Sequence, residues 1–309
     1  MGNTVELAKV FQQELDRTLV AKAVTGIFEL NSDQVKYTGG QEIMIPKITI
    51  DGGLGDYDRA TGYAEGAVTF EYETHKMTMD RSLKFNIDAM DNDETGFVFS
   101  ATNTMQSIQS TKIVPEVDAY RLSKISSLAI AGDKAAYGYV PAAATILNEL
   151  KTQIGEIRDA VGEDVELVCM MAQPALTQLE AADGLTRFLS VDTIEKAGVE
   201  TRVRSLDGVK IFAVPSLRMK SAYVFNDKKS VGQEAGGFVP AAGAKSVNWI
   251  LVPKNGPIAV SKTDKVRIFS PDENQEANAW RVDYRKYHDM FLPDNVLDAV
   301  KISVKEAEV

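Results

Sequence analysis

Cysteine and histidine are almost absent from this chain. Its 309 residues contain one cysteine and two histidines, so an intrachain disulfide is impossible and a zinc site has few ligands to draw on. Cys169 lies in the apolar run 165–172, which predicts a buried strand, so we expect a small core residue and not a nucleophile. His75 and His288 lie far apart, outside any local catalytic signature, and are expected to have structural or solvent-exposed roles.

Long hydrophobic runs and an excess of basic residues are also missing. No run of eighteen apolar residues occurs, and the start Met-Gly-Asn-Thr-Val-Glu-Leu lacks the profile of a signal peptide. We therefore expect no membrane insertion and no export, with synthesis and retention in a cytoplasm. A net charge of −10 works against a large phosphate-binding surface. The chain is not expected to grip nucleic acid through a basic face.

Nucleotide-binding motifs are absent as well. No Gly-Lys-Ser or Gly-Lys-Thr phosphate loop occurs, and Gly52-Gly-Leu-Gly55 has Asp58 where a dinucleotide fingerprint needs its third glycine. The segment 284–288 mixes basic and aromatic residues, but the alternation of Trp280, Val282 and Tyr284 predicts a strand with one packed face. We expect no cofactor.

A strand-like alternation over residues 67–88 is the most informative pattern present. Val68, Phe70 and Tyr72 share one parity, and the apolar parity changes midway to that of Met77 and Met79. A straight strand of this length would reach about 70 Å, against a diameter of about 50 Å for a compact globule of this size. The strand must bend, or part of it must leave the body of the protein.

The second leg of this predicted ribbon is 41–50, and the connection 51–66 has the glycine and aspartate content of a flexible tip. An apolar strand that projects has no core of its own, which favours burial against another protein molecule. An ordinary hairpin with a disordered loop is the alternative.

Helical and strand patterns alternate along the rest of the chain. Helices are predicted at 4–24, from 97 through a restart at Pro115 to Gly132, at 141–161, and after Pro174. Strands are predicted at 165–172, 199–203, 209–214, 222–225, 247–252, 265–269, 280–292 and 296–304, with a glycine-rich loop at 228–246. The mixture indicates an α+β fold with a compact α/β lobe.

The acidic cluster 88–95 has two interpretations. Asp88, Asp91, Asp93 and Glu94 could bind a divalent cation, but their spacing does not match a calcium loop. Capping of the following helix explains the carboxylates better. A metal-dependent hydrolase built on them stays open as an alternative function.

Several segments together resemble the major capsid proteins of tailed bacteriophages with the Hong Kong 97-type fold. They are 79–88 followed by 91–95, then 113–122, and finally 280–289, which look like the base of the extended loop, the spine helix and a peripheral strand. The resemblance implies an N-terminal arm at 1–35 and an extended loop at 36–87. It also implies a peripheral domain formed by 88–138 and 247–309, and an axial domain at 139–246.

The function that the resemblance implies is a subunit of an icosahedral shell. Hexamers and pentamers of this chain would enclose double-stranded DNA, assembled in the bacterial host cytoplasm with a scaffolding protein, a portal and decoration proteins. An encapsulin-like compartment is the nearest alternative, and no catalytic, cofactor or metal residue is expected. The residues expected at contacts between subunits are Leu7, Phe11, Asp51, Leu54, Arg59, Tyr63, Val68, Phe70 and Tyr72.

The chain departs from some members of that family in two ways. It starts directly at the arm, without a scaffolding segment, so a separate scaffolding protein or a processed product is implied. Lys47 lies on the predicted ribbon, but no motif identifies partners for a Lys-Asn crosslink, and that chemistry is not carried over.

Overall fold

The structure is a computed structural model that describes residues 23–37, 41–51, 53, 57, 59, 67–88, 101–182, 189–196 and 199–308. Its helices are η1 (Val24–Gln34), α3 (Ala101–Ile108), the π-helical η2 (Gln109–Ile113), α4 (Val114–Ala131), α5 (Ile146–Val161), α6 (Gln173–Glu180), η4 (Ser216–Arg218) and η5 (Asp294–Ala299). None of the described helices is long and apolar enough to cross a membrane.

The strands form four separate sheets, which agrees with the α+β class. They are β1 (Lys36–Tyr37), β2 (Glu42–Asp51), β3 (Ala67–Lys76), β4 (Met79–Asp88), β5 (Ala135–Ala136), β6 (Leu167–Ala172), β7 (Leu189–Lys196), β8 (Val199–Leu206), β9 (Val209–Val214), β10 (Tyr223–Phe225), β11 (Phe238–Pro240), β12 (Val247–Pro253), β13 (Ile258–Phe269), β14 (Ala279–Phe291) and β15 (Lys301–Val304). The sheet orders are β5-β15-β12-β6-β9-β8-β7, β13-β14-β4, β1-β2-β3 and β10-β11.

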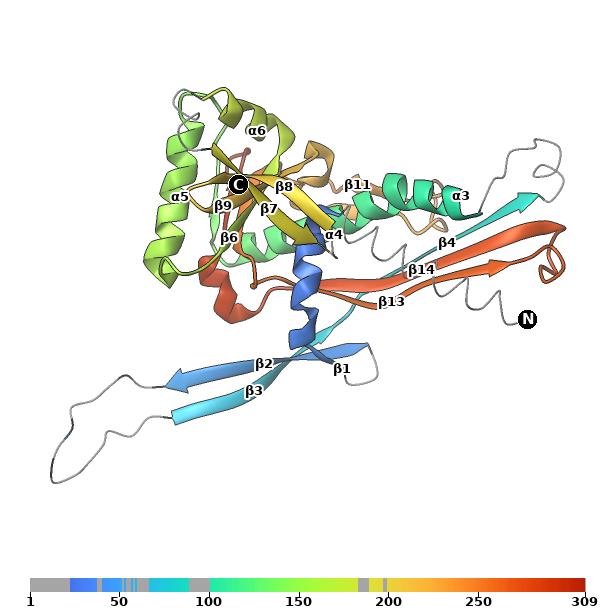
Figure 1. Cartoon of the computed structure of the whole chain (residues 1–309), viewed down its shortest axis with the longest axis horizontal. Coiled ribbons are helices and arrows are strands. Elements are labelled where there is room, and N and C mark those ends of the chain that lie inside the picture. Colours follow the sequence, from blue (N-terminus) through green and yellow to red (C-terminus); the bar gives the residue numbers. More distant parts are fainter. Residues whose placement is uncertain are drawn as a thin grey trace.

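The arrangement in space is one compact lobe with two elongated extensions (Figure 1). The seven-stranded sheet and helices α5 and α6 make the lobe, the long sheet β13-β14-β4 runs out beside the α3–α4 helix, and β2 and β3 project on the other side. The strand-like segment 67–88 therefore forms two strands in two different sheets: β3 ends at Lys76 and pairs with β2, and β4 begins at Met79 and pairs with β14. That transition explains the change of apolar parity.

The predicted long helix is present, and a change of helix type marks the position where a restart at Pro115 was expected. Helices α3, η2 and α4 follow one another without a break from 101 to 131, and the π-helical η2 directly precedes α4, in whose first turn Pro115 lies. Gly132 follows as the C-cap, and its N–H donates to the carbonyl of Leu128 at 3.0 Å. We call this continuous element the spine helix.

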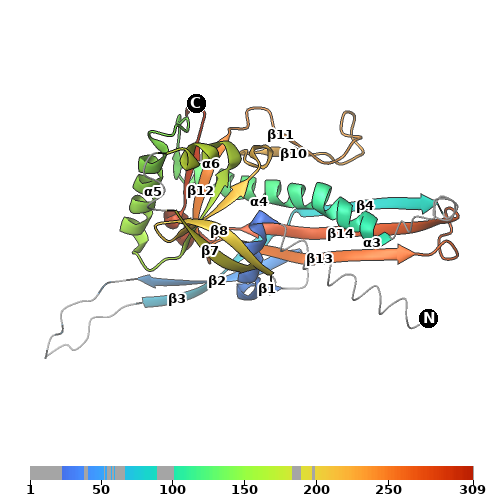
Figure 2. The same ribbon diagram turned by 45° about the horizontal axis from the view of Figure 1, so that its top comes forward.

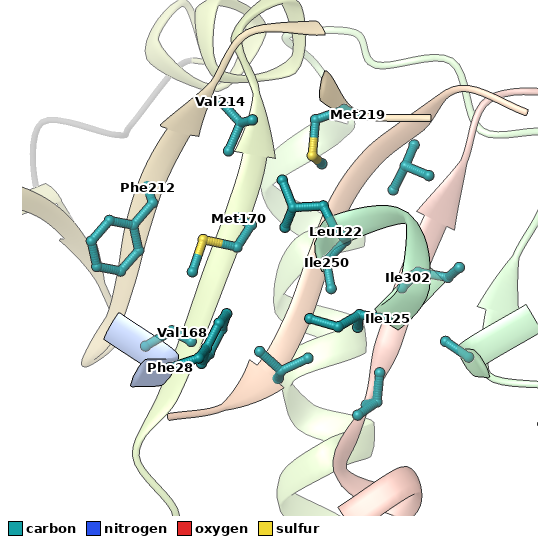
Figure 3. Close-up of a cluster of buried hydrophobic side chains, with 14 of the residues drawn as sticks. Phe28, Leu122, Ile125, Val168, Met170, Phe212, Val214, Met219, Ile250 and Ile302 are labelled. Atoms are coloured by element: carbon teal, nitrogen blue, oxygen red, sulfur yellow. The ribbon is translucent and has the colours of Figure 1, made fainter. Parts of the chain in front are cut away.

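The main core lies between the spine helix and the seven-stranded sheet (Figure 3). Leu122 and Ile125 of α4 pack against Met170, Ile250 and neighbouring strand residues, and Phe28 of η1 closes one end. A second core cluster on the other face of the sheet contains Cys169, which is fully buried as predicted, and burial raises the pKa of its thiol. Tertiary packing thus explains the continuous apolar run at 167–172.

Several local predictions differ from the structure. The helix predicted at 141–161 begins at Ile146, and the strand predicted at 265–269 begins at Ile258. The stretch 296–304 is a 3-10 turn, η5, followed by the short strand β15, because the turn that begins at Pro293 continues through Ala299. Strand β7 was not foreseen, since the alternation of apolar residues is broken between Val191 and Ile194 and the segment is mostly polar. Asp88 ends strand β4 and does not start a helix, and the other acids of its cluster lie outside the described residues.

The glycine-rich stretch 228–246 is a loop, as predicted, interrupted by β11. Its hairpin with β10 lies along the spine helix, on the side opposite the sheet β13-β14-β4 (Figure 2). The Tyr120 ring of α4 meets Phe225 edge-on with a centroid distance of 5.6 Å. Arg81 of β4 donates to the carbonyl of Asn226 at 2.9 Å, which fixes the base of the hairpin.

Candidate interaction surface

The projecting ribbon exposes one apolar face. Strands β2 and β3 pair antiparallel from Glu42 opposite Lys76 to Asp51 opposite Ala67. In this register Ile48 lies opposite Phe70, and Pro46 lies opposite Tyr72, so these side chains and that of Val68 share a face. The exposed fractions are 58% for Ile48, 75% for Phe70, 52% for Tyr72 and 54% for Val68. We call Pro46, Ile48, Val68, Phe70 and Tyr72 the ribbon face.

The structure locates only part of the residues expected at subunit contacts. Val68, Phe70 and Tyr72 lie together on the exposed ribbon face, and Arg59 is exposed in the connection. Asp51 ends β2. Leu7, Phe11, Leu54 and Tyr63 lie outside the described residues.

Ile48 and Pro46 belong to the same face but were not foreseen. Both parities of β2 carry apolar residues, so alternation within 42–50 alone does not tell which side is exposed. The signal was the pairing register, because residues opposite Tyr72 and Phe70 must point to the same side.

The opposite face of the ribbon anchors it to the body near its base. Ile43 and Ile45 are buried in a cluster with Met77, Ile258 and Phe291. Lys47 follows on the same face and donates to the Asp294 carboxylate of η5 at 3.1 Å. The pKa of Lys47 is raised by this hydrogen bond. Anchoring on one side leaves the ribbon face free to contact another molecule.

The ribbon is joined to the body by a carboxylate at its base. Asp289 of β14 is fully buried, and it accepts hydrogen bonds from the N–H of Thr78 at 2.9 Å and the hydroxyl of Tyr120 at 2.7 Å. Lys124 of α4 supplies the counter-charge at 2.9 Å. Thr78 stands between β3 and β4, so Asp289 holds the point where the chain changes sheets to both the long sheet and the spine helix.

A second buried carboxylate holds the N-terminal part of the described chain. Asp118 of α4 accepts from the N–H of Thr25 at 3.0 Å, from the Thr25 hydroxyl at 2.7 Å and from Arg218 of η4 at 3.2 Å. One turn on, the fully buried Arg121 pairs with Glu29 at 2.6 Å. Three parts of the chain, η1, the spine helix and η4, are thereby fixed to one another.

The described residues offer little for catalysis. No group of three or more His, Cys, Asp or Glu side chains among them could hold a metal ion. A shallow depression between α6 and η4 is lined by Gln173, Pro174, Thr177, Pro215 and Ser216, which include no titratable side chain. His288 is fully buried, and burial followed by the nearby Arg121 lowers the pKa of its imidazole well below the ordinary value. A neutral, enclosed histidine fits the predicted structural role.

Several solved structures from phages and a virus-like particle have a similar architecture, although no family model and no curated protein sequence matches the chain. A structure from Mycobacterium phage Bobi superposes with a TM-score of 0.57 at 9% identity, covering 91% of each chain. The mature capsid of bacteriophage PhiM1 gives 0.52 at 12%, covering 84% of this chain and 81% of the other. The virus-like particle from Pyrococcus furiosus gives 0.50 at 10%, covering 90% and 96%.

The likeness extends over nearly the whole chain while sequence identity stays near a tenth. Such a likeness shows the architecture and not the individual role. The spine helix beside a long sheet, the compact lobe and the projecting ribbon occur together in the order that the sequence resemblance implied. The chain has the Hong Kong 97-type fold of tailed-phage major capsid proteins.

Proposed function

We propose that this protein assembles into hexamers and pentamers that build an icosahedral head around a double-stranded DNA genome. The observation that carries the proposal is the ribbon face, which is apolar, projects from the body and has no core of its own. In this proposal each ribbon lies across an adjacent copy, which buries that face. The assembled particle would be a virion component made in the host cytoplasm with scaffolding, portal and decoration proteins.

Each part of the fold has a proposed role in the shell. Residues 1–35 act as an arm, 36–87 as the extended loop, 88–138 with 247–309 as a peripheral domain, and 139–246 as an axial domain at the capsomer centre. Each contact is moderate, and a standard interface of about 1,600 Å² would suffice. Repetition over several neighbours then stabilises a closed shell without exceptional pair affinity.

Electron microscopy and sedimentation velocity of the full chain test the proposal, alone and with its scaffolding partner co-expressed. Closed shells of uniform size are expected. Deleting 51–66 should leave a folded, soluble subunit that no longer forms normal shells. Normal shells from this deletion would refute the role of the ribbon, and a monomer under all these conditions would refute assembly.

An encapsulin-like compartment is the second candidate, because the virus-like particle from Pyrococcus furiosus also superposes on the chain. Nuclease treatment of particles purified from phage-producing cells separates the two functions. Protected double-stranded DNA inside the particle supports the capsid role, and enclosed protein without protected DNA supports the compartment.

A further inference from the structure

Cations gather on one face of the sheet β13-β14-β4. Val282 and Tyr284 of β14 pack against Met105 of the spine helix, so the side chains between them point to the other side of the sheet. By the pairing registers and the ion pairs of Glu276, this other side carries five cations and four carboxylates, a net charge of +1 on a chain whose total is −10. The members of this basic face are Lys84, Lys265, Arg267, Arg281 and Arg285, with Asp80, Asp88, Glu276 and Asp283.

Three of the four carboxylates, those of Asp80, Glu276 and Asp283, form ion pairs with cations of the same face. Arg281 makes a two-pronged contact with Asp283, at 2.8 and 2.9 Å, and also reaches Glu276 at 3.1 Å. Lys84 pairs with the same Glu276, and this contact lowers the pKa of that carboxyl. These ion pairs orient the guanidinium group of Arg281 and leave the acids little capacity to neutralise further cations.

A second ion pair binds Arg285 in the same way. Its guanidinium holds Asp80 at 3.0 and 2.6 Å, while 60% of the Arg285 side chain stays exposed. The pair lies at the edge of the face nearer the base of the ribbon, because Asp80 is the second residue of β4. The charges of Arg285 and Asp80 cancel in this pair, so the excess positive charge comes from other residues of the face.

The excess positive charge comes from β13. Lys265 and Arg267 are exposed and lie two residues apart on the same side of the strand. Lys265 also faces Arg285 directly across the strands, a pairing of like charges that destabilises a sheet. Among the described residues no carboxylate comes within 4 Å of the charged ends of Lys265 or Arg267. Asp283 lies opposite Arg267 in the register, but Arg281 holds that carboxylate. Within the part of the chain that the structure describes, Lys265 and Arg267 therefore have no close counter-charge, and an external anion can contact both.

We propose that the basic face binds the phosphate backbone of nucleic acid. Residues i and i+2 of a strand are about 6.8 Å apart, a distance comparable to the spacing of charges along the DNA backbone, where each strand carries one charge per about 3.4 Å of helix axis. Lys265, Arg267 and the exposed Arg285 can thus contact neighbouring phosphates without reading the bases. The inference rests on the proposed function, which supplies the polyanion as the enclosed genome.

Few contacts per copy suit such a role. Two or three charge contacts give weak, salt-sensitive binding, and repetition over a shell gives a large total without holding any one segment of the genome tightly. The net charge of −10 opposes DNA binding over the chain as a whole, which favours a weak contact confined to a local cluster of cations. The expectation that no basic face grips nucleic acid followed from net charge alone, which cannot show how charge is distributed over a fold.

An acidic segment of a neighbouring copy is the competing occupant. The sequence 51–66 holds four acids and one arginine, a net charge of −3. The ribbon next to it presents apolar side chains, however, and the basic face offers no apolar partner beyond Phe269, which Arg281 already covers with its guanidinium carbon 5.5 Å from the ring centroid. Phosphate groups therefore match the chemistry of the basic face better than the apolar ribbon of a neighbouring copy does.

Fluorescence anisotropy with a labelled duplex of about 30 base pairs tests the inference. The full chain is titrated between 50 and 200 mM salt, with its assembly state checked by sedimentation. The double variant K265Q/R267Q is compared with K228Q/K229Q, which removes the same charge from exposed lysines of the β10–β11 loop. Loss of two phosphate contacts should lower the slope of log K against log salt by about 2. The control variant should keep the wild-type slope.

Two results would overturn the inference while shells still form. They are an absence of salt-dependent DNA binding by the wild type, and an equal loss in both double variants. The competing occupant would be supported by two results together: K265Q/R267Q keeps its DNA binding but loses assembly, and D56K/D58K restores assembly to a K265E/R267E chain. The basic face would then bind the segment 51–66 of a neighbouring copy and not DNA. If no shells form from the wild type, the proposed function fails independently of the DNA result.

Discussion

Replacement of Phe70 by serine isolates the contribution of the ribbon face. Phe70 is 75% exposed in the subunit, so the substitution removes almost no buried contact, and the free energy of unfolding should change by less than about 0.5 kcal/mol. Full burial of a phenylalanine stabilises by up to about 3 kcal/mol. Three quarters of that value, about 2 kcal/mol, should be lost at each contact between copies, which is roughly a 30-fold weaker contact.

Light scattering during assembly measures this loss. The subunit concentration at which shells appear should rise at least tenfold for Phe70→Ser, because each subunit contributes one ribbon and accepts another. The matched control is Val231→Ser, which removes an apolar side chain that is 98% exposed on the β10–β11 loop, away from the ribbon. Equal assembly by wild type and Phe70→Ser, with unchanged thermal unfolding in both, would refute the burial of this face.

Three further predictions concern the subunit itself. Asp289→Asn leaves Lys124 facing a neutral group and should lower the free energy of unfolding by about 2–3 kcal/mol in urea titrations. Trypsin should also cleave faster after the exposed Lys76, because the base of the ribbon is held less firmly. Cys169 should not react with a thiol reagent until the protein unfolds, because burial raises its pKa and blocks access; rapid labelling of the native protein would contradict its place in the core. His288 is neutral in the folded protein, whereas in the unfolded chain it protonates below about pH 6.5. The free energy of unfolding should therefore fall by about 1.4 kcal/mol for each pH unit below that point. The His288→Gln variant should lose less stability between pH 7 and pH 5 than the wild type.

The order of elements could be predicted from the sequence because each carries a local signal. The strand pattern of 67–88 follows from alternation, and Pro115 and Gly132 lie near the beginning and end of α4. The buried strand around Cys169 follows from a continuous apolar run. These features depend on neighbours along the chain, so a single sequence contains them.

The rest depends on contacts between distant residues. The register that places Ile48 opposite Phe70 joins residues 22 positions apart (70 − 48), and no local pattern specifies it. Asp289 is separated from Thr78 by 211 positions, so its role as the anchor of the ribbon cannot be recognised before the fold is known. The same holds for the basic face, which takes its cations from β4, β13 and β14.

The buried polar groups share one position in the fold. Asp118 belongs to α4 and holds η1, and Asp289 of β14 contacts α4 and holds the base of the ribbon. A buried charge fixes geometry because each lost partner costs more than the pair itself contributes. The spine helix therefore supports both η1 and the base of the ribbon.

A cryo-electron microscopy reconstruction of the assembled full-length protein tests the central claim most directly. We predict a closed shell in which β2 and β3 of each copy lie on an adjacent subunit, with Ile48, Phe70 and Tyr72 covered by it. A shell in which these side chains stay in contact with solvent, or a protein that remains monomeric in the presence of its scaffolding partner, would contradict the account.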